Sequence, residues 1–232
     1  MLKNINNKKL PYNTYNFNAR SYKEDYRVAG WDSENTMINK FKLAADTIKF
    51  DGISDWLDVG CGPGSFFKYI NASCNMTGVD ISEDVVARAN TNYPNATYNI
   101  MDVEKLSFPD ESFDLITMLG VLDIIAIDPH QAIMEAMRVS KGGGIVYIAT
   151  KNINWMGFRG GSKPDTKYNW YSISDITDAI DMYNGRSIYM GGYDESGGEI
   201  VSLNDSDTMF IFAMKNPTLA KESTGDSDNT SA

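Results

Sequence analysis

The chain has 232 residues and a formal net charge of −10. This length fits one domain with a sizeable core, and the composition excludes collagen-like, coiled-coil and repetitive proteins. The two cysteines, Cys61 and Cys74, form neither a disulfide framework nor part of a spaced cluster of zinc ligands. No metal site is therefore predicted, and the cytoplasm is the expected compartment.

The charge is distributed unevenly along the chain. Residues 1–27 contain six basic and two acidic side chains, so the remainder carries a net charge of −14. A strongly acidic protein is a poor general binder of nucleic acid, because phosphate contacts need a positive surface. The basic, Asn-rich arm is interpreted either as a solvated segment or as a mobile segment that meets an acidic partner or closes over a substrate.

No membrane partner is expected. The longest apolar stretch, residues 116–127, is too short to span a bilayer and is interrupted by Asp123. The N-terminal sequence lacks the apolar segment of a secretory signal.

Short β-branched runs alternate with helical patterns, which predicts a parallel α/β sheet. Strands are predicted over residues 56–60, 76–80, 96–101, 113–118, 144–150, 188–193 and 209–214. Helices are predicted over 34–48, after Ser82, after a capping box formed by Asp128 and Gln131, and over 172–183. Residues 152–171 are predicted to form a loop over one edge of the sheet.

The strongest local signal is LDVGCGPG at residues 57–64, a buried strand that runs into a glycine turn. Gly60 and Gly62 permit positive φ angles and let a ligand lie against the backbone. Asp80 ends the next predicted strand, where a carboxylate can accept hydrogen bonds from both ribose hydroxyls. This pairing predicts a ligand that contains adenosine. A tight turn that binds nothing is the alternative.

A dinucleotide is a poorer match to this turn. The G-x-G-x-x-G pattern requires glycine at position 65, where the chain has Ser65, and Pro63 removes one backbone N–H that would bind a pyrophosphate. No phosphate-binding G-x-x-x-x-G-K-[ST] loop occurs either. A phosphate-free adenosine ligand is therefore favoured over NAD.

Four motifs occur in an order that resembles the class I S-adenosylmethionine (SAM)-dependent methyltransferases. They are WLDVGCGPG, TGVDIS, MDVEKLSFPDESFDLIT and EAMRVSKGGGIVYIAT, and they lie between residues 56 and 150. The resemblance implies a doubly wound, mostly parallel, seven-stranded Rossmann-like α/β sheet. It further implies helices on both faces and one antiparallel strand from a terminal hairpin.

The resemblance also implies a set of cofactor-binding residues. Asp80 would bind the ribose, Asp102 the adenine amino group, with Val103 beside the ring, and Asp58 would stand near the methionyl amine. The others expected to line the cofactor site are Gly60, Cys61, Gly62, Gly64, Phe66, Ile81 and Leu119. Phe66 and Leu119 are equally consistent with ordinary core packing.

The segment VAGWDSENTMINKFKLAADTI resembles small-molecule members of the family, in which a Gly-Trp stretch precedes a helix of the active-site lid. We therefore expect an N-terminal arm and helical lid over residues 1–50 and a SAM-binding methyltransferase domain over 51–215. Within the latter, residues 152–184 form a substrate-side loop and helix. Residues 216–232 lack apolar periodicity and are expected to be a disordered tail.

Two residues are candidates for catalysis. His130 is the only histidine, but its place at the second position of a capped helix favours a solvent-facing side chain. In many relatives a Glu/His pair follows the fourth strand; here Asp123 matches the acid, and Ile124 stands where the histidine would be. Methyl transfer from a sulfonium depends mainly on positioning, so the missing histidine leaves the catalytic residues unassigned.

Aromatic residues cluster before the motif region, among them Tyr15, and after it, among them Tyr168. Both groups are expected over the carboxyl ends of the strands. Tyr26, Trp31, Trp155 and Trp170 are the candidates for binding an aromatic acceptor or an amine, or alternatively for packing the lid. The expected function is N- or O-methylation of a small molecule by a monomer or homodimer. The alternatives are an RNA or protein methyltransferase and a non-catalytic SAM-binding regulatory subunit.

Overall fold

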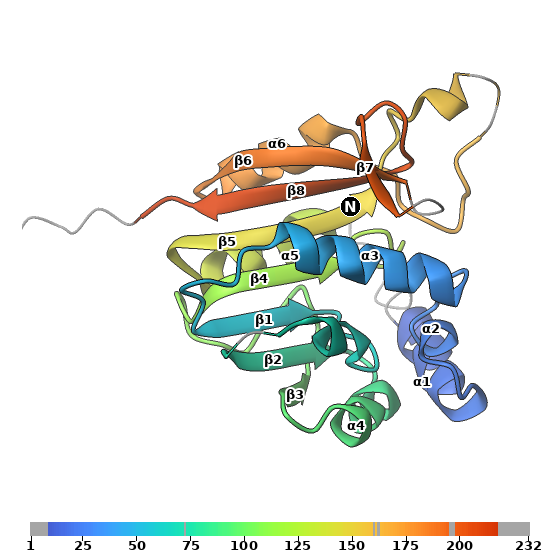
Figure 1. Ribbon diagram of the computed structural model, residues 1–232, viewed down its shortest axis with the longest axis vertical. Helices are drawn as coiled ribbons and strands as arrows, with labels where there is room; N and C mark the ends of the chain where they lie inside the picture. The colour runs from blue at the N-terminus through green and yellow to red at the C-terminus, as the bar shows by residue number, and fades with distance from the viewer. Residues whose placement is uncertain (1–8, 72, 160, 162, 195–197, 218–232) are drawn as a thin grey trace, which may run out of the picture.

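Eight strands form one sheet in the computed structural model, which describes residues 9–217 except 72, 160, 162 and 195–197 (Figure 1). The order across the sheet is β3-β2-β1-β4-β5-β8-β6-β7. The strands are β1 (Asp55–Val59), β2 (Asn75–Asp80), β3 (Thr97–Ile100), β4 (Phe113–Leu119), β5 (Ser140–Lys151), β6 (Gly185–Asp194), β7 (Glu199–Val201) and β8 (Thr208–Lys215). Strands β1 to β5 pair in parallel, whereas β8 runs antiparallel to both β5 and β6.

The predicted doubly wound, mostly parallel sheet is confirmed, but the count of seven strands is not. Each of the seven predicted segments is a strand, and the eighth is β7, which pairs antiparallel with residues 192–194 of β6. This strand lies in the long polar connection between β6 and β8. Its three residues are too few to show an alternating apolar pattern.

The predicted helix starts are confirmed, with one correction. Ser33, Ser82 and Ser172 cap α3 (Glu34–Thr47), α4 (Glu83–Asn92) and α6 (Ile173–Met182). Asp128 caps α5 (Pro129–Val139) by accepting a hydrogen bond from the His130 backbone N–H. The expected capping box with Gln131 is not formed there; a capping box is formed instead at α6, between Ser172 and Asp175.

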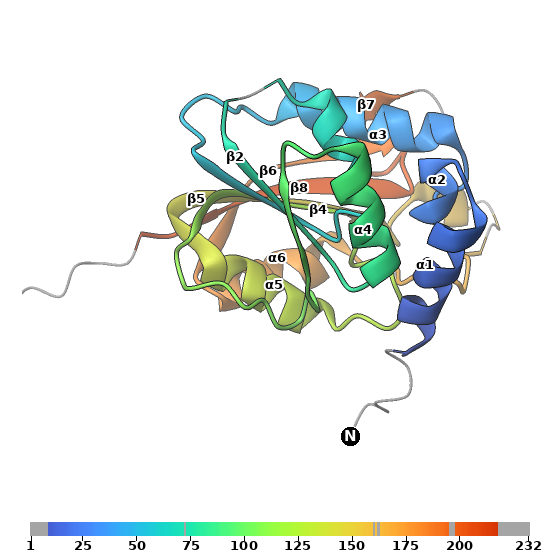
Figure 2. The same ribbon diagram turned by 90° about the horizontal axis from the view of Figure 1, so that it is seen from below.

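Helices cover both faces of the sheet (Figure 2). On one face, α3, α4 and the short 3-10 helix η2 (Ser65–Tyr69) pack around Trp56, which is fully buried. On the other face, α5 and α6 pack through Ile133, Met137 and Ile176 against β1, β4 and β5. Residues 152–171 contain only the short 3-10 helix η3 (Met156–Phe158) and isolated β-bridges.

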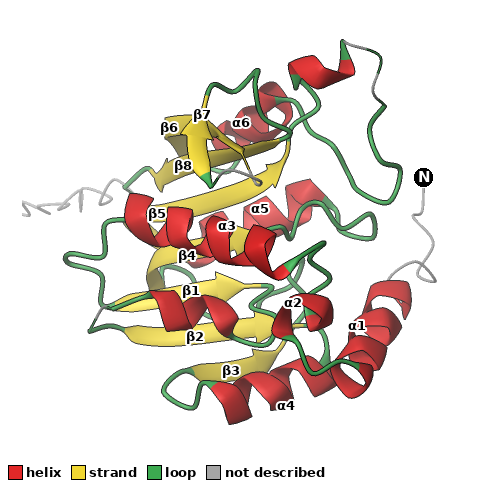
Figure 3. Cartoon of the chain, turned by 45° about the vertical axis from the view of Figure 1, so that its right-hand side comes forward, coloured by secondary structure: helices red, strands yellow, loops and turns green. Residues whose placement is uncertain are grey.

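Part of the basic arm is helical rather than extended. Helices α1 (Lys9–Ser21) and α2 (Asp25–Val28) lie at the carboxyl ends of the parallel strands (Figure 3). Asn16 of α1 is buried and accepts hydrogen bonds from Ser82 Oγ (2.7 Å) and the Asp84 backbone N–H (3.2 Å). Arg88 donates to the Tyr22 carbonyl (2.7 Å) and pairs with Asp25, which holds the segment after α1 against α4.

The start of the basic arm and nearly all of the expected disordered tail fall in residues 1–8 and 218–232, which lie outside the described part. None of the helices in the described part is both long and apolar enough to cross a membrane.

Candidate functional site

The glycine turn between β1 and η2 has the backbone geometry that its sequence predicts. Gly60, Gly62 and Gly64 have φ angles of 70°, 54° and 79°. A Cβ atom at Gly60 would lie 2.5 Å from Val121 Cγ2, so this glycine is required by packing as well as by its φ angle. The N–H groups of Gly60 and Cys61 both donate to the Val79 carbonyl (2.8 and 2.9 Å), which ties the turn to the end of β2.

Asp80 lies directly beside this turn. Its carboxylate accepts hydrogen bonds from the backbone N–H groups of Gly62 (3.1 Å) and Ser82 (2.9 Å). Burial raises the pKa of Asp80, although these hydrogen bonds act in the opposite direction. Each oxygen of a carboxylate can accept more than one hydrogen bond, so both remain able to bind a diol.

Asp58 is a second carboxylate on the same wall, two residues before Gly60. It is 3% exposed and accepts a hydrogen bond from Thr117 Oγ1 (2.6 Å), which in turn accepts one from Trp56 Nε1 (2.9 Å). Burial raises the pKa of Asp58 to about 7, helped by the charge of Asp80 and opposed by the Thr117 hydrogen bond. A cation beside Asp58 would favour its ionised form.

Beside these carboxylates lies a cavity that opens to solvent. Its empty space is about 1420 Å³ when the volume includes the solvent at the opening. Its walls come from the ends of β1, β2, β4 and β5, from the loops that follow these strands, and from α1, α2 and α3. The expected cofactor residues that line it are Asp58, Gly60, Cys61, Gly62, Asp80, Ile81, Asp102, Val103 and Leu119.

Two expected cofactor residues lie behind the wall. A Cβ atom at Gly64 would lie 2.6 Å from the Tyr98 hydroxyl, so this glycine lets the turn pack closely on β3. Phe66 is buried in the core beneath the turn, against Phe41 and Trp56.

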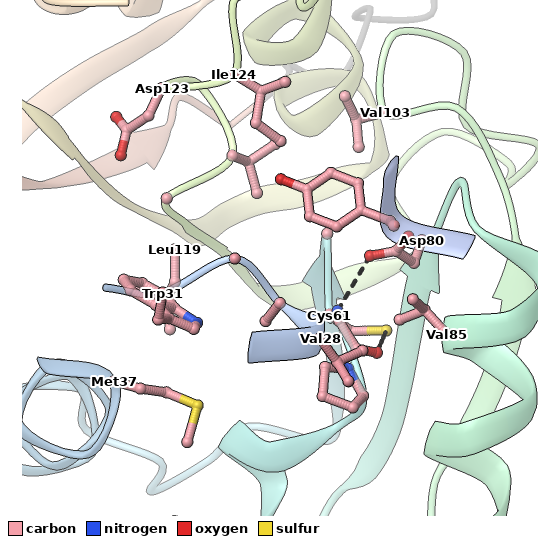
Figure 4. A pocket seen from close by; sticks show the side chains of 18 of the residues that line it. Val28, Trp31, Met37, Cys61, Asp80, Val85, Val103, Leu119, Asp123 and Ile124 are labelled. Atoms are coloured by element: carbon pink, nitrogen blue, oxygen red, sulfur yellow. Dashed lines mark hydrogen bonds between the residues drawn. The ribbon is translucent and has the colours of Figure 1, made fainter. Parts of the chain in front are cut away.

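The other end of the cavity is built around Asp123. Asp123 and Asp80 lie on opposite sides of the space, and Trp31 lies on the same side as Asp123 (Figure 4). Asp123 is 6% exposed and accepts hydrogen bonds from Thr150 Oγ1 and the Lys151 backbone N–H (2.8 Å). Gly120 leaves space here, because a Cβ atom would lie 3.3 Å from the Trp31 ring and 3.7 Å from Asp123 Oδ2.

The remaining candidates do not line the cavity. His130 is exposed at the start of α5, and its neighbour Asp128 is the helix cap. Tyr26 accepts a hydrogen bond from Arg27 Nε (3.0 Å) at the surface. Trp155 and Trp170 each pack edge-to-face on Phe158, at 5.1 and 5.0 Å between ring centroids, in the loop that follows β5.

Lys40 and Lys151 are charged lining residues that were not anticipated from the sequence, whereas Tyr15 and Tyr168, which also line the cavity, belong to the two aromatic clusters expected there. Burial raises the pKa of Tyr15, and the charges of Asp80 and Asp123 raise it further, so its hydroxyl lies in the field of both carboxylates. Lys40 occupies an inward position in the amphipathic pattern of α3, which is the one signal that could have marked it. Tyr15 was indicated only by its place in the N-terminal aromatic cluster, because the arm lacks a clear apolar period.

The chemistry of the two ends differs. At one end, carboxylates and the exposed backbone of the glycine turn can contact a nucleoside. At the other end, the wall contains an aromatic ring, a carboxylate and two lysines. Among the described residues, no group of three or more His, Cys, Asp or Glu side chains is placed to hold a metal ion. The arrangement suits two adjacent organic ligands.

Comparison with known proteins finds matches in the central part of the chain. Residues 57–148 match the family model described as a methyltransferase domain. The phosphatidylethanolamine N-methyltransferase of Cereibacter sphaeroides is 31% identical over 98 residues, which are 40% of this chain and 48% of that protein. The ubiquinone biosynthesis O-methyltransferase of Hydrogenovibrio crunogenus is 31% identical over 108 residues, 44% of each chain. The chain thus spans about half the length of these curated relatives.

Solved structures agree on the fold. A SAM-dependent methyltransferase of Thermotoga maritima, described as a possible histamine N-methyltransferase, superposes with a TM-score of 0.64. The match covers 88% of this chain and 99% of that one at 16% identity, which supports the fold alone. The resemblance and fold class inferred from the motifs are confirmed, and SAM is the cofactor of that class.

Proposed function

Because residues 57–148 form a methyltransferase domain of the class I, SAM-dependent type, we propose that the chain binds SAM and methylates a small molecule. The observation that carries this proposal is the joint position of the glycine turn, Asp80 and Asp123 on one cavity. A nucleoside at Asp80 and an acceptor at Asp123 would share this enclosed space.

The residues present fit SAM better than a dinucleotide. Asp80 supplies the acceptor for a ribose diol, and the positive φ angles of Gly60 and Gly62 open the backbone to the ligand. Pro63 and Ser65 stand where a pyrophosphate would need a backbone donor and a glycine. Asp58, at the turn, is placed to attract a cationic amine.

When bound, SAM supplies an activated methyl group on a sulfonium. The chain contributes positioning: Asp80 and the turn fix the nucleoside, and the walls around Trp31 and Leu119 exclude water. In-line transfer between two held reactants depends on this geometry more than on any acid or base. A catalytic proton transfer is needed only if the acceptor atom carries a proton.

A small acceptor is supported by what covers the cavity. Tyr15 of α1, Val28 of α2 and Met37 of α3 all contribute to the wall, so the space is closed in by the N-terminal helices. The curated relatives are named for a phospholipid and for ubiquinone biosynthesis. An RNA acceptor has less support, because the chain has a net charge of −10 and Arg20 of the basic arm pairs with Asp84 (2.6 Å).

The proposal is tested with methyl-labelled SAM and a cell extract separated into small metabolites, RNA and protein. We expect label to enter the small-metabolite fraction. Label in RNA or protein would support the corresponding alternative. Binding of S-adenosylhomocysteine without any labelled product would support a regulatory subunit.

A further inference from the structure

Three charged residues are buried together at the acceptor end of the cavity. Lys40, Asp123 and Lys151 are 2%, 6% and 7% exposed, and each contributes to the cavity wall. They come from α3, from the loop after β4 and from the end of β5. Burying three charges is costly, so their common position requires an explanation.

One oxygen of Asp123 is directed toward the space beside Trp31. Oδ1 accepts the hydrogen bonds from Thr150 and the Lys151 backbone, and Oδ2 lies on the side of Gly120 and the Trp31 ring. An acceptor that binds beside Gly120, which has no side chain, would therefore contact Oδ2.

The charges of two lysines act on this carboxylate. Lys40 Nζ lies 4.6 Å from the centre of the Trp31 ring, and Lys151 Nζ lies 3.2 Å from Asp207 Oδ2. The charges of both lysines lower the pKa of Asp123, but burial raises it by more. The other titratable groups in its field are Tyr15, from α1, and Tyr171, from the loop after β5.

This arrangement disfavours an amine as acceptor. The face of Trp31 that could hold an ammonium by a cation–π contact is already used by Lys40. An amine attacks as the neutral base and becomes cationic as it takes the methyl group, so Lys40 and Lys151 would repel the charge that develops, and such repulsion is strong in a site with little water. A phenolic hydroxyl meets the opposite conditions, because the lysines stabilise its oxyanion and its pKa of about 10 lets a carboxylate take the proton, which the far higher pKa of an alcohol does not.

We propose that the acceptor atom is a phenolic oxygen, that Asp123 takes the phenol proton, and that Lys40 stabilises the phenolate. The proposal rests on the function proposed above and names its acceptor. The phenol O–H bond breaks and its proton goes to Asp123. The phenolate then forms the O–CH₃ bond while the C–S bond breaks, and its electron pair leaves on the neutral sulfur. Asp123 afterwards returns the proton to water.

The bond type of the product is the first test, and it can be determined before the acceptor is identified. Labelled small-molecule product from the full chain is treated with mild alkali and, separately, with hot hydriodic acid. A methyl ether resists alkali and releases labelled methyl iodide in the acid. The ultraviolet absorption of the labelled product then distinguishes an aryl methyl ether from an alkyl one, and an alkyl methyl ether overturns the proposal. Release by alkali, which indicates an ester, or retention in both, which indicates N- or C-methylation, overturns the proposal. Bound S-adenosylhomocysteine with no labelled small molecule instead overturns the proposed function itself.

Variants then test Asp123 as the base and Lys40 as the residue that stabilises the phenolate. Asp123→Asn retains the Oδ1 acceptor for the Lys151 backbone, and we expect it to lower kcat/KM about 100-fold or more near neutral pH. Its rate should recover about tenfold per pH unit toward pH 10, where phenols ionise without a base. Lys40→Met should lose a similar factor, with partial rescue in Lys40→Arg. Lys42→Met, an exposed neighbour on α3, is the matched control.

The affinity for S-adenosylhomocysteine should change less than threefold in all these variants, which separates an acceptor defect from misfolding. Unchanged kcat/KM in Asp123→Asn, or a loss that high pH does not restore, contradicts the assignment of Asp123 as the base. Full activity in Lys40→Met contradicts the role of Lys40.

Discussion

Asn16, in the first helix, accepts a hydrogen bond from Ser82 Oγ at 2.7 Å, and Ser82 is the residue that caps α4 shortly after Asp80. The neighbour of Asn16, Tyr15, lines the cavity. One side-chain contact therefore connects the helix over the cavity to the loop that carries the ribose-binding candidate.

Asn16→Ala should loosen α1. The variant removes the hydrogen bonds from Ser82 Oγ and the Asp84 backbone N–H, each worth about 1 kcal/mol, so local opening of the helix becomes roughly thirtyfold more frequent. Hydrogen–deuterium exchange of residues 12–21 measures this directly. Asn13→Ala, an exposed position in the same helix, is the control, and equal exchange in both variants would contradict the contact.

Asp80→Asn should weaken nucleoside binding. The amide places an N–H donor where the Gly62 or Ser82 backbone N–H now donates, and it removes a charged acceptor for the ribose. We expect the affinity for S-adenosylhomocysteine to fall about tenfold or more in calorimetry. Asp110→Asn, at a side chain that is 74% exposed, should leave it unchanged. An affinity in Asp80→Asn equal to that of the wild type would exclude Asp80 from the site.

Binding should depend on pH through Asp58. Its pKa of about 7 means that the group is largely protonated below pH 7, and a cationic methionyl amine favours the ionised form. Binding at pH 6 should therefore release close to one proton, whereas binding at pH 8.5 should release almost none. Calorimetry in buffers of different ionisation enthalpy measures this number, and Asp58→Asn should abolish the difference.

Asp58 should also make the free energy of unfolding depend on pH. An unfolded Asp has a pKa near 3.9, so the raised value means that the folded chain binds the proton more tightly. The contribution of Asp58 to the free energy of unfolding should decrease as pH rises from about 4 to about 7. In urea unfolding, Asp58→Asn should be less sensitive to pH across this window than the wild type.

Gly60→Ala should be clearly more destabilising than Gly52→Ala. Both glycines have positive φ angles, 70° and 80°, so both variants lose about 1–2 kcal/mol through the backbone. A Cβ atom at Gly60 also meets Val121, whereas none of the described atoms lies within 4 Å of one at Gly52. This overlap adds about 1–3 kcal/mol, measurable as the difference between the two urea midpoints. Equal losses would show that Val121 moves aside freely.

Sequence patterns predicted the sheet and the cofactor side of the cavity because both follow from local rules. Parallel strands place their carboxyl ends at one edge, so Asp58 and Asp80 had to lie near the glycine turn. On the acceptor side, Asp123 and Trp31 were predicted, but the two buried lysines depend on tertiary contacts that leave no such pattern. A lysine such as Lys40 is ordinarily solvated, and its burial is evident only once Trp31 is seen to lie beside it.

Helix α1 was not predicted for a similar reason. Its sequence, KLPYNTYNFNARS, is rich in Asn and Tyr, which are weak helix formers, and it has no regular apolar face. Contacts of Asn16 and Arg20 with α4 stabilise it instead. Such polar contacts connect residues more than sixty positions apart and cannot be inferred from local periodicity.

The most direct measurement is a calorimetric titration of the wild-type chain with S-adenosylhomocysteine and, separately, with NAD. Saturable heat with S-adenosylhomocysteine and none with NAD is the result expected for a phosphate-free nucleoside held by Gly60, Gly62 and Asp80. Heat with NAD alone would contradict the assignment of this cavity as a SAM site.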